Sequence, residues 1–134
     1  MKNSGLALQS VSLLNDNDIT LLELKGYSRQ QVVELMNVVD VVLMTSFSEG
    51  SPQFIKEALA CNCPIVSVPV GDVPHVIEKV KGCYLTTYEP HDVAEKISMA
   101  LEFGKRTKGR ERLMEMKLDI DSVAERIVEL YDSL

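Results

Sequence analysis

The chain of 134 residues, 46% of them hydrophobic, has the size of one globular domain with a single core, which argues against a complete two-domain enzyme. Its formal net charge of −6 disfavours a nucleic-acid or anionic-membrane surface, because both of these partners attract clustered Lys and Arg. No apolar run approaches the ~20 residues of a membrane span, and Met1-Lys2-Asn3 leads into no signal-peptide core, so we expect a cytoplasmic protein.

The N-terminal part of the chain begins with a helix pattern. Residues 1–15 carry apolar side chains at helical spacing, and no strand pattern precedes them. Residues 19–24 then predict a strand that Gly26 closes, and Ser28 is a suitable N-cap for a helix that continues through Val39. Because a doubly wound domain normally opens with a strand, the sequence predicts a domain that lacks its first strand.

The remainder of the chain alternates strands and helices more regularly. Expected strands cover residues 41–44, 64–70 and 82–86. Expected helices cover residues 52–60, 73–80, 90–104, 108–116 and 121–134. Short connections between alternating elements imply parallel pairing with right-handed crossovers. The predicted fold class is therefore α/β, with a doubly wound, Rossmann-like parallel sheet.

The most informative stretch is the turn between the strand at 41–44 and the helix that Pro52 opens. Ligands of open α/β sheets bind beyond the carboxyl ends of the strands, where this turn lies. The helix start offers free N–H groups and the positive end of a dipole, which suit a phosphate. Glu49 and Glu57 flank this position with seven residues between them. Because carboxylates repel phosphate, they are better suited to accept hydrogen bonds from neutral hydroxyls, so a nucleotide sugar fits the stretch.

The segment from Glu49 to Glu57, followed by Ala58-Leu59-Ala60-Cys61-Asn62-Cys63-Pro64-Ile65-Val66, resembles the donor-binding signature of retaining family 4 glycosyltransferases with the two-domain GT-B fold. That signature has two glutamates spaced in this way, a helix end of small residues and a proline that opens the next strand. The resemblance implies that residues 1–134 form the nucleotide-sugar-binding C-terminal domain, one half of a GT-B architecture. It also implies that an N-terminal acceptor domain is missing from this chain, so the isolated fragment is expected to be inactive.

The resemblance further implies a role for each matching residue in sugar transfer to an acceptor hydroxyl with retention of configuration. Glu49 would contact the transferred sugar and stabilise positive charge at its anomeric carbon, and Glu57 would accept hydrogen bonds from the ribose hydroxyls. The remaining donor-binding residues are Gly50, Ser51, Gln53, Phe54, Gly71 and Lys2. Of these, Gln53 and Phe54 would present backbone N–H groups to the diphosphate. The nucleotide sugar is a substrate, and neither a metal nor another cofactor is expected.

Some positions depart from this pattern or have two interpretations. Asp72 stands where the family commonly has a second glycine and His75 where it commonly has glutamate, so the Gly71 turn differs from the usual donor loop. Lys2 is either the remnant of a basic residue that meets the donor phosphates or a terminal residue without that role. A titrating role is the alternative to a structural one for Asp40 and His75.

Two other function classes and a second location stay open. One class is a nucleotide-sugar epimerase of GT-B architecture, and the other is a non-enzymatic Rossmann-like signalling module such as a receiver-like domain. A receiver would need an acidic pair after its first strand and a phosphoacceptor Asp after its third, and the sequence has neither pattern. A cytoplasmic protein could also be peripheral to the membrane through the missing domain.

The cysteine pattern indicates neither disulfides nor a metal site. The chain has 3 cysteines, an odd number. Cys61 and Cys63 have no neighbouring His or further Cys to complete a zinc site. We therefore expect buried or half-buried thiols.

Overall fold

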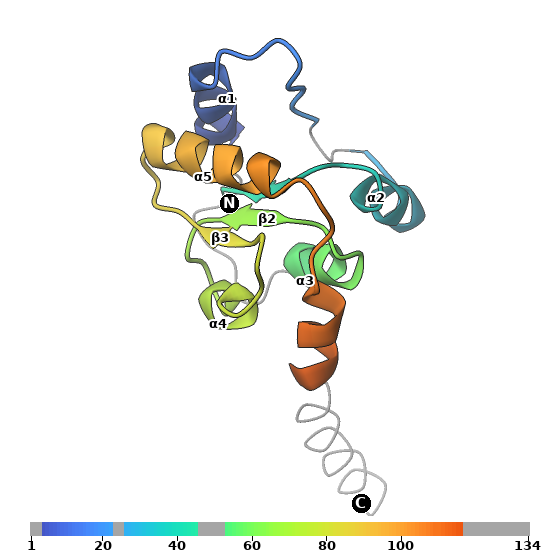
Figure 1. Cartoon of the computed structure of the whole chain (residues 1–134). Helices are drawn as coiled ribbons and strands as arrows, with labels where there is room; N and C mark the ends of the chain where they lie inside the picture. Colours follow the sequence, from blue (N-terminus) through green and yellow to red (C-terminus); the bar gives the residue numbers. More distant parts are fainter. Residues whose placement is uncertain (1–3, 23–25, 46–52, 117–134) are drawn as a thin grey trace, which may run out of the picture.

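The computed structural model describes residues 4–22, 26–45 and 53–116. Its centre is a three-stranded parallel sheet with the order β1-β2-β3 (Figure 1). The strands are β1 (Val42–Met44), β2 (Ile65–Ser67) and β3 (Tyr84–Leu85). In register, Val42 lies opposite Ile65 and Ser67 lies opposite Leu85. The parallel pairing expected from the short connections is confirmed.

Five named helices surround this sheet. They are α1 (Ser4–Leu13), α2 (Arg29–Met36), α3 (Gln53–Ala60), α4 (Val73–Ile77) and α5 (Pro90–Phe103). Residues 109–116 are also helical, whereas the helix expected over 121–134 lies outside the described residues. In Figure 1, α1 and α5 lie on one side of the sheet and α3 and α4 on the other. Helices on both faces confirm the doubly wound α/β class.

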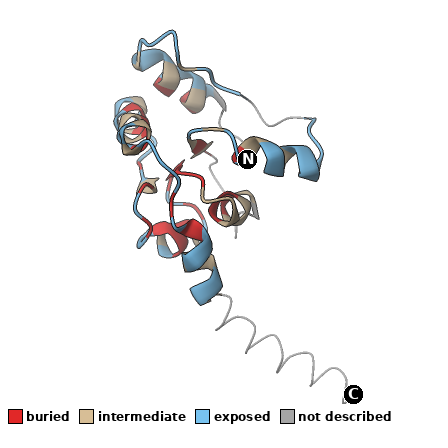
Figure 2. Ribbon diagram, turned by 45° about the vertical axis from the view of Figure 1, so that its right-hand side comes forward, coloured by how far each residue is buried: buried red, intermediate tan, exposed pale blue. Residues whose placement is uncertain are grey.

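The core forms because each element turns its apolar residues toward the sheet. All of β2 is buried, as expected for a central parallel strand covered on both faces. Helix α3 buries Ile55, Ala58 and Leu59, which recur at helical spacing. Figure 2 shows that the buried residues gather on the strands and on the helix faces turned toward them.

Helix α2 begins where the sequence predicts and ends earlier. The Ser28 hydroxyl accepts a hydrogen bond from the Gln31 N–H (3.2 Å), and the Ser28 N–H donates to Gln31 Oε1 (2.9 Å). This reciprocal capping box satisfies two backbone donors at the start of the helix. The helix stops at Met36 rather than Val39, with Asn37 as its C-cap.

The strand predicted over residues 19–24 is wrong for the part that the structure describes. Residues 19–22 have no strand conformation and run between α1 and α2. Leu21 and Leu22 are 37% and 45% exposed, so their side chains do not supply the burial that a sheet strand requires. An apolar run alone therefore misled the prediction, because a strand also needs a neighbouring strand to accept its hydrogen bonds.

Three arginines that follow α5 donate hydrogen bonds to carbonyl groups of α2, α3 and α4. We call these residues, Arg106, Arg110 and Arg112, the arginine strap. Arg106 donates to the Met36 carbonyl, at the end of α2, and to the Cys61 carbonyl, just after α3. Arg110 Nε donates to the Ala60 carbonyl and Arg112 Nη2 to the His75 carbonyl in α4. Cations at helix carboxyl ends satisfy orphan carbonyls and oppose the helix dipole favourably.

Candidate functional site

Glu57 lies half-buried in the middle of α3, and it pairs with an arginine of the neighbouring helix. The side chain of Glu57 is 18% exposed, and its Oε1 lies 3.3 Å from Nε of Arg29, whose own side chain is 78% exposed. Because Ile55, Ala58 and Leu59 of α3 face the core, Glu57 belongs to the polar side of this helix. The predicted acceptor of ligand hydrogen bonds is thus a carboxylate with a charged partner beside it.

The turn between β2 and α4 is joined to α3 by a second ion pair. Gly71 has a φ of +53°, a left-handed conformation that glycine adopts without steric cost. Asp72 is the N-cap of α4, yet its side chain makes no capping hydrogen bond, and its Oδ2 lies 3.4 Å from Nζ of Lys56. The structure therefore brings the Gly71 turn next to the helix that carries Glu57.

The predicted diphosphate contacts fall at the start of α3. The described part of α3 begins at Gln53, so Gln53 and Phe54 are the first two described residues of this helix. The side chain of Phe54 is partly buried and packs against the core. Four other predicted site residues lie outside the described residues: Lys2, Glu49, Gly50 and Ser51.

A further polar cluster lies at the carboxyl end of β3. Asp92 Oδ2 accepts hydrogen bonds from the N–H (2.8 Å) and hydroxyl (2.9 Å) of Thr87, and Lys96 Nζ lies 2.8 Å from Asp92 Oδ1. Lys96, followed by the two Thr87 donors, holds the pKa of Asp92 well below its ordinary value of 3.8. The same contact raises the pKa of Lys96. These bonds connect β3 to the first turn of α5, and the sequence analysis missed them.

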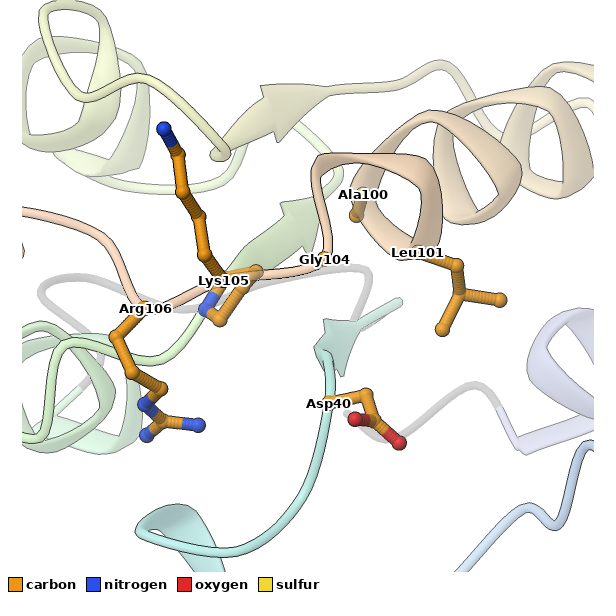
Figure 3. A pocket seen from close by; sticks show the side chains of 7 residues that line it. Asp40, Ala100, Leu101, Gly104, Lys105 and Arg106 are labelled. Carbon is orange, nitrogen blue, oxygen red and sulfur yellow. The ribbon is translucent and has the colours of Figure 1, made fainter.

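A separate cavity of about 100 Å³ lies elsewhere in the domain. Figure 3 shows the residues that line it. Its lining residues are Asp40, Pro64, Ala100, Leu101, Gly104, Lys105 and Arg106. Asp40 and Pro64 precede β1 and β2, so this cavity is at the amino ends of the strands. Among the described donor-binding residues of the prediction (Gln53, Phe54, Glu57 and Gly71), none lines it. Asp40 is exposed in a bend before β1, on the amino-terminal side of that strand.

His75 is exposed, whereas the three thiols are buried or half-buried. His75 Nδ1 lies 3.8 Å from Glu78 Oε1, and the His75 side chain is 71% exposed. Burial raises the pKa of the Cys63 thiol to about 11 and that of the Cys83 thiol to about 12, so both remain protonated at neutral pH. The prediction of buried and half-buried thiols is confirmed. Within the described ranges, no group of three or more His, Cys, Asp or Glu side chains is arranged to hold a metal ion.

Arg29 and Lys56 are the two site residues that sequence reasoning did not single out. Lys56 lies within the segment from Glu49 to Glu57, but its partner Asp72 lies in the turn between β2 and α4. Arg29 follows a clear N-cap, yet nothing in the local pattern indicates that its side chain reaches a different helix.

The parallel sheet is covered by helices on both faces, and the polar side of α3 meets the Gly71 turn. This arrangement defines a Rossmann-like α/β domain. The profile of the family described as Glycosyl transferases group 1 matches residues 6–102. The chain belongs to this family, and its fold is consistent with one half of a GT-B architecture. Family membership favours the glycosyltransferase interpretation over a signalling module.

Individual relatives agree with this assignment. Over 112 residues the chain is 32% identical to the N,N'-diacetylbacillosaminyl-diphospho-undecaprenol alpha-1,3-N-acetylgalactosaminyltransferase of Campylobacter jejuni, a match that covers 78% of this chain and 29% of that protein. Over 76 residues it is 34% identical to the D-inositol 3-phosphate glycosyltransferase of Mycolicibacterium smegmatis, covering 56% of this chain and 18% of that protein. The chain thus spans less than a third of the length of these relatives.

No helix among residues 4–22, 26–45 and 53–116 is both long enough and apolar enough to cross a membrane.

Proposed function

We propose that this chain is the C-terminal, nucleotide-sugar-binding domain of a retaining family 4 glycosyltransferase. The observation that carries the proposal is the family match over residues 6–102, which includes both Glu49 and Glu57. The relatives are named for transferring sugars, and each is much longer than this chain. In this proposal the acceptor site and the rest of the catalytic cleft belong to a second, N-terminal domain, and the 134 residues alone transfer nothing.

In this function α3 holds the nucleotide. The half-buried Glu57 carboxylate accepts hydrogen bonds from the ribose hydroxyls, because an ionised carboxylate offers acceptors only. The N–H groups of Gln53 and Phe54 receive the diphosphate at the positive end of the helix dipole. The Gly71 turn, tied to α3 through Lys56 and Asp72, borders the same region.

The sugar end of the donor meets the turn before α3. Glu49 contacts the transferred sugar and stabilises positive charge at the anomeric carbon, while Gly50 and Ser51 allow the backbone to approach it. Lys2 supplies a positive charge to the phosphates. Stabilisation of the leaving diphosphate by the helix dipole and basic side chains then favours departure of the nucleotide, with no metal ion or cofactor required.

The test uses the full-length protein that carries this chain, with radiolabelled UDP-, GDP- and ADP-sugars. Release of nucleotide only when an acceptor is present supports the transferase, whereas interconversion of sugars without acceptor indicates an epimerase. Glu57→Gln should weaken nucleotide binding by roughly tenfold or more, the contribution of a hydrogen bond to a charged group. The matched control Glu95→Gln makes the same change at an exposed position of α5 and should bind normally. If the wild-type protein binds no nucleotide sugar, the proposed function is wrong.

A further inference from the structure

The start of α2 places an arginine beside α3. Arg29 is the first residue of α2, directly after the Ser28 N-cap. The capping box between Ser28 and Gln31 fixes the backbone here without any contribution from the arginine side chain. The helix start therefore holds the backbone of Arg29 in place, and the guanidinium is not needed for this capping.

Local electrostatics disfavours a cation at this position. The first turn of a helix is the positive end of its dipole, where acidic side chains are stabilising and basic ones are not. Helix α2 has no acidic residue in its first turn, so the compensating charge comes from outside the helix. That charge is Glu57, whose Oε1 lies 3.3 Å from Arg29 Nε.

The two members of this ion pair differ in exposure. Glu57 is 18% exposed and Arg29 is 78% exposed, so the carboxylate sits against the protein while the guanidinium lies on the solvent side. A carboxylate has about four acceptor positions on its two oxygens, and one donor at Oε1 leaves capacity for further donors. The arginine thus restricts rotation of the carboxylate without using up its ability to accept hydrogen bonds.

We propose that Arg29 is a positioning residue that orients Glu57 toward the two vicinal hydroxyls of the nucleotide ribose, and that this pair determines selectivity for ribose over deoxyribose nucleotides. The inference rests on the proposed function, because it assigns Glu57 to the ribose. A carboxylate held in one orientation accepts two adjacent hydroxyls without losing side-chain entropy on binding. Removal of Arg29 leaves Glu57 in place but no longer oriented.

A purely structural ion pair leads to a different expectation. Because the Arg29 side chain is 78% exposed, the pair contributes little to stability, and Arg29→Gln should leave the domain folded. If Arg29 only stabilised the contact between α2 and α3, its loss would weaken the binding of all nucleotides by the same factor. If Arg29 positions Glu57, its loss should weaken the binding only of nucleotides that carry the ribose hydroxyls.

The experiment is isothermal titration of the full-length protein with UDP, GDP and ADP and with the 2′,3′-dideoxy analogue of each. For the nucleotide that binds, wild type should prefer the ribose form by roughly tenfold or more. Arg29→Gln should reduce this preference to about twofold while the affinity for the dideoxy analogue stays unchanged, and Arg29→Lys should lie between the two. The control Lys79→Gln removes the same charge at an exposed position and should keep the wild-type preference.

Two results would overturn the inference while leaving the proposed function intact. One is a wild-type protein that binds nucleotide without preferring ribose. The other is an Arg29→Gln variant that keeps the wild-type preference or weakens both forms equally. If wild type binds none of the three nucleotides, the proposed function is wrong, and the inference that depends on it is wrong as well. Circular dichroism of each variant establishes that it is folded, and Arg29→Lys provides a second, milder change.

Discussion

Arg106 is the residue through which the strap joins two helices at once. Its Nη2 donates to the Met36 carbonyl (2.6 Å) and to the Cys61 carbonyl (2.8 Å), and its Nη1 donates to the Val39 carbonyl (3.0 Å). We predict that Arg106→Met destabilises the chain, because methionine keeps an apolar stem but removes every donor. The carboxyl ends of α2 and α3 then lose their shared cation.

The size of the effect follows from these contacts. Hydrogen bonds from a charged donor contribute more to stability than neutral ones. Because part of this site is exposed to water, we take the contribution of each bond as about 1 kcal/mol. Loss of the Arg106 bonds should therefore lower the free energy of unfolding by about 3 kcal/mol. For a domain of this size that corresponds to a decrease in Tm of roughly 10 °C.

Urea denaturation followed by circular dichroism measures this change. The control Lys108→Met removes the same charge from an exposed position of the same segment and should stay within about 0.5 kcal/mol of wild type. Arg106→Lys keeps the charge but lacks the planar fork of donors, so it should recover only about 1 kcal/mol. Full recovery by lysine would refute the reasoning, since charge at the helix ends would then suffice without the specific bonds.

Two further predictions concern a close approach and a charge. Gly109→Ala would place a Cβ 2.9 Å from the carbonyl oxygen and 3.0 Å from Cα of Leu59, so it should destabilise the chain by about 1–3 kcal/mol in urea denaturation. The control Gly5→Ala, with nothing within 4 Å, should stabilise α1 by up to about 1 kcal/mol, and equal effects at both sites would contradict this interpretation. Because the folded state lowers the pKa of Asp92 below its ordinary 3.8, its carboxylate stabilises the fold above about pH 4, and this contribution is lost as the pH falls toward the folded-state pKa. Asp92→Asn should therefore cost about 1 kcal/mol at pH 7 and progressively less toward pH 3, and a constant difference across that range would show that the charge is not responsible.

Much of the fold was predictable from the sequence because its signals are local. The apolar runs at 41–44 and 64–70, the Ser28 cap and the Pro90 helix start each depend on a few consecutive residues, and the structure has an element at each place. Strand lengths were not predictable. The run that opens with Pro64 contributes only Ile65–Ser67 to the sheet, since a strand extends only as far as its neighbours pair with it, and β3 has two residues.

In the candidate site, too, some features were predictable from the sequence and others depend on the packing of the helices. The glutamate spacing and the expected helix opening at Pro52 are linear features, so the sequence alone points to Glu57. The pairing of Arg29 with Glu57, of Lys56 with Asp72, and of the strap with the helix ends depends on how helices pack. No local pattern encodes which side chain of one helix faces the next, because that choice follows from burial of the apolar faces that bring the helices together.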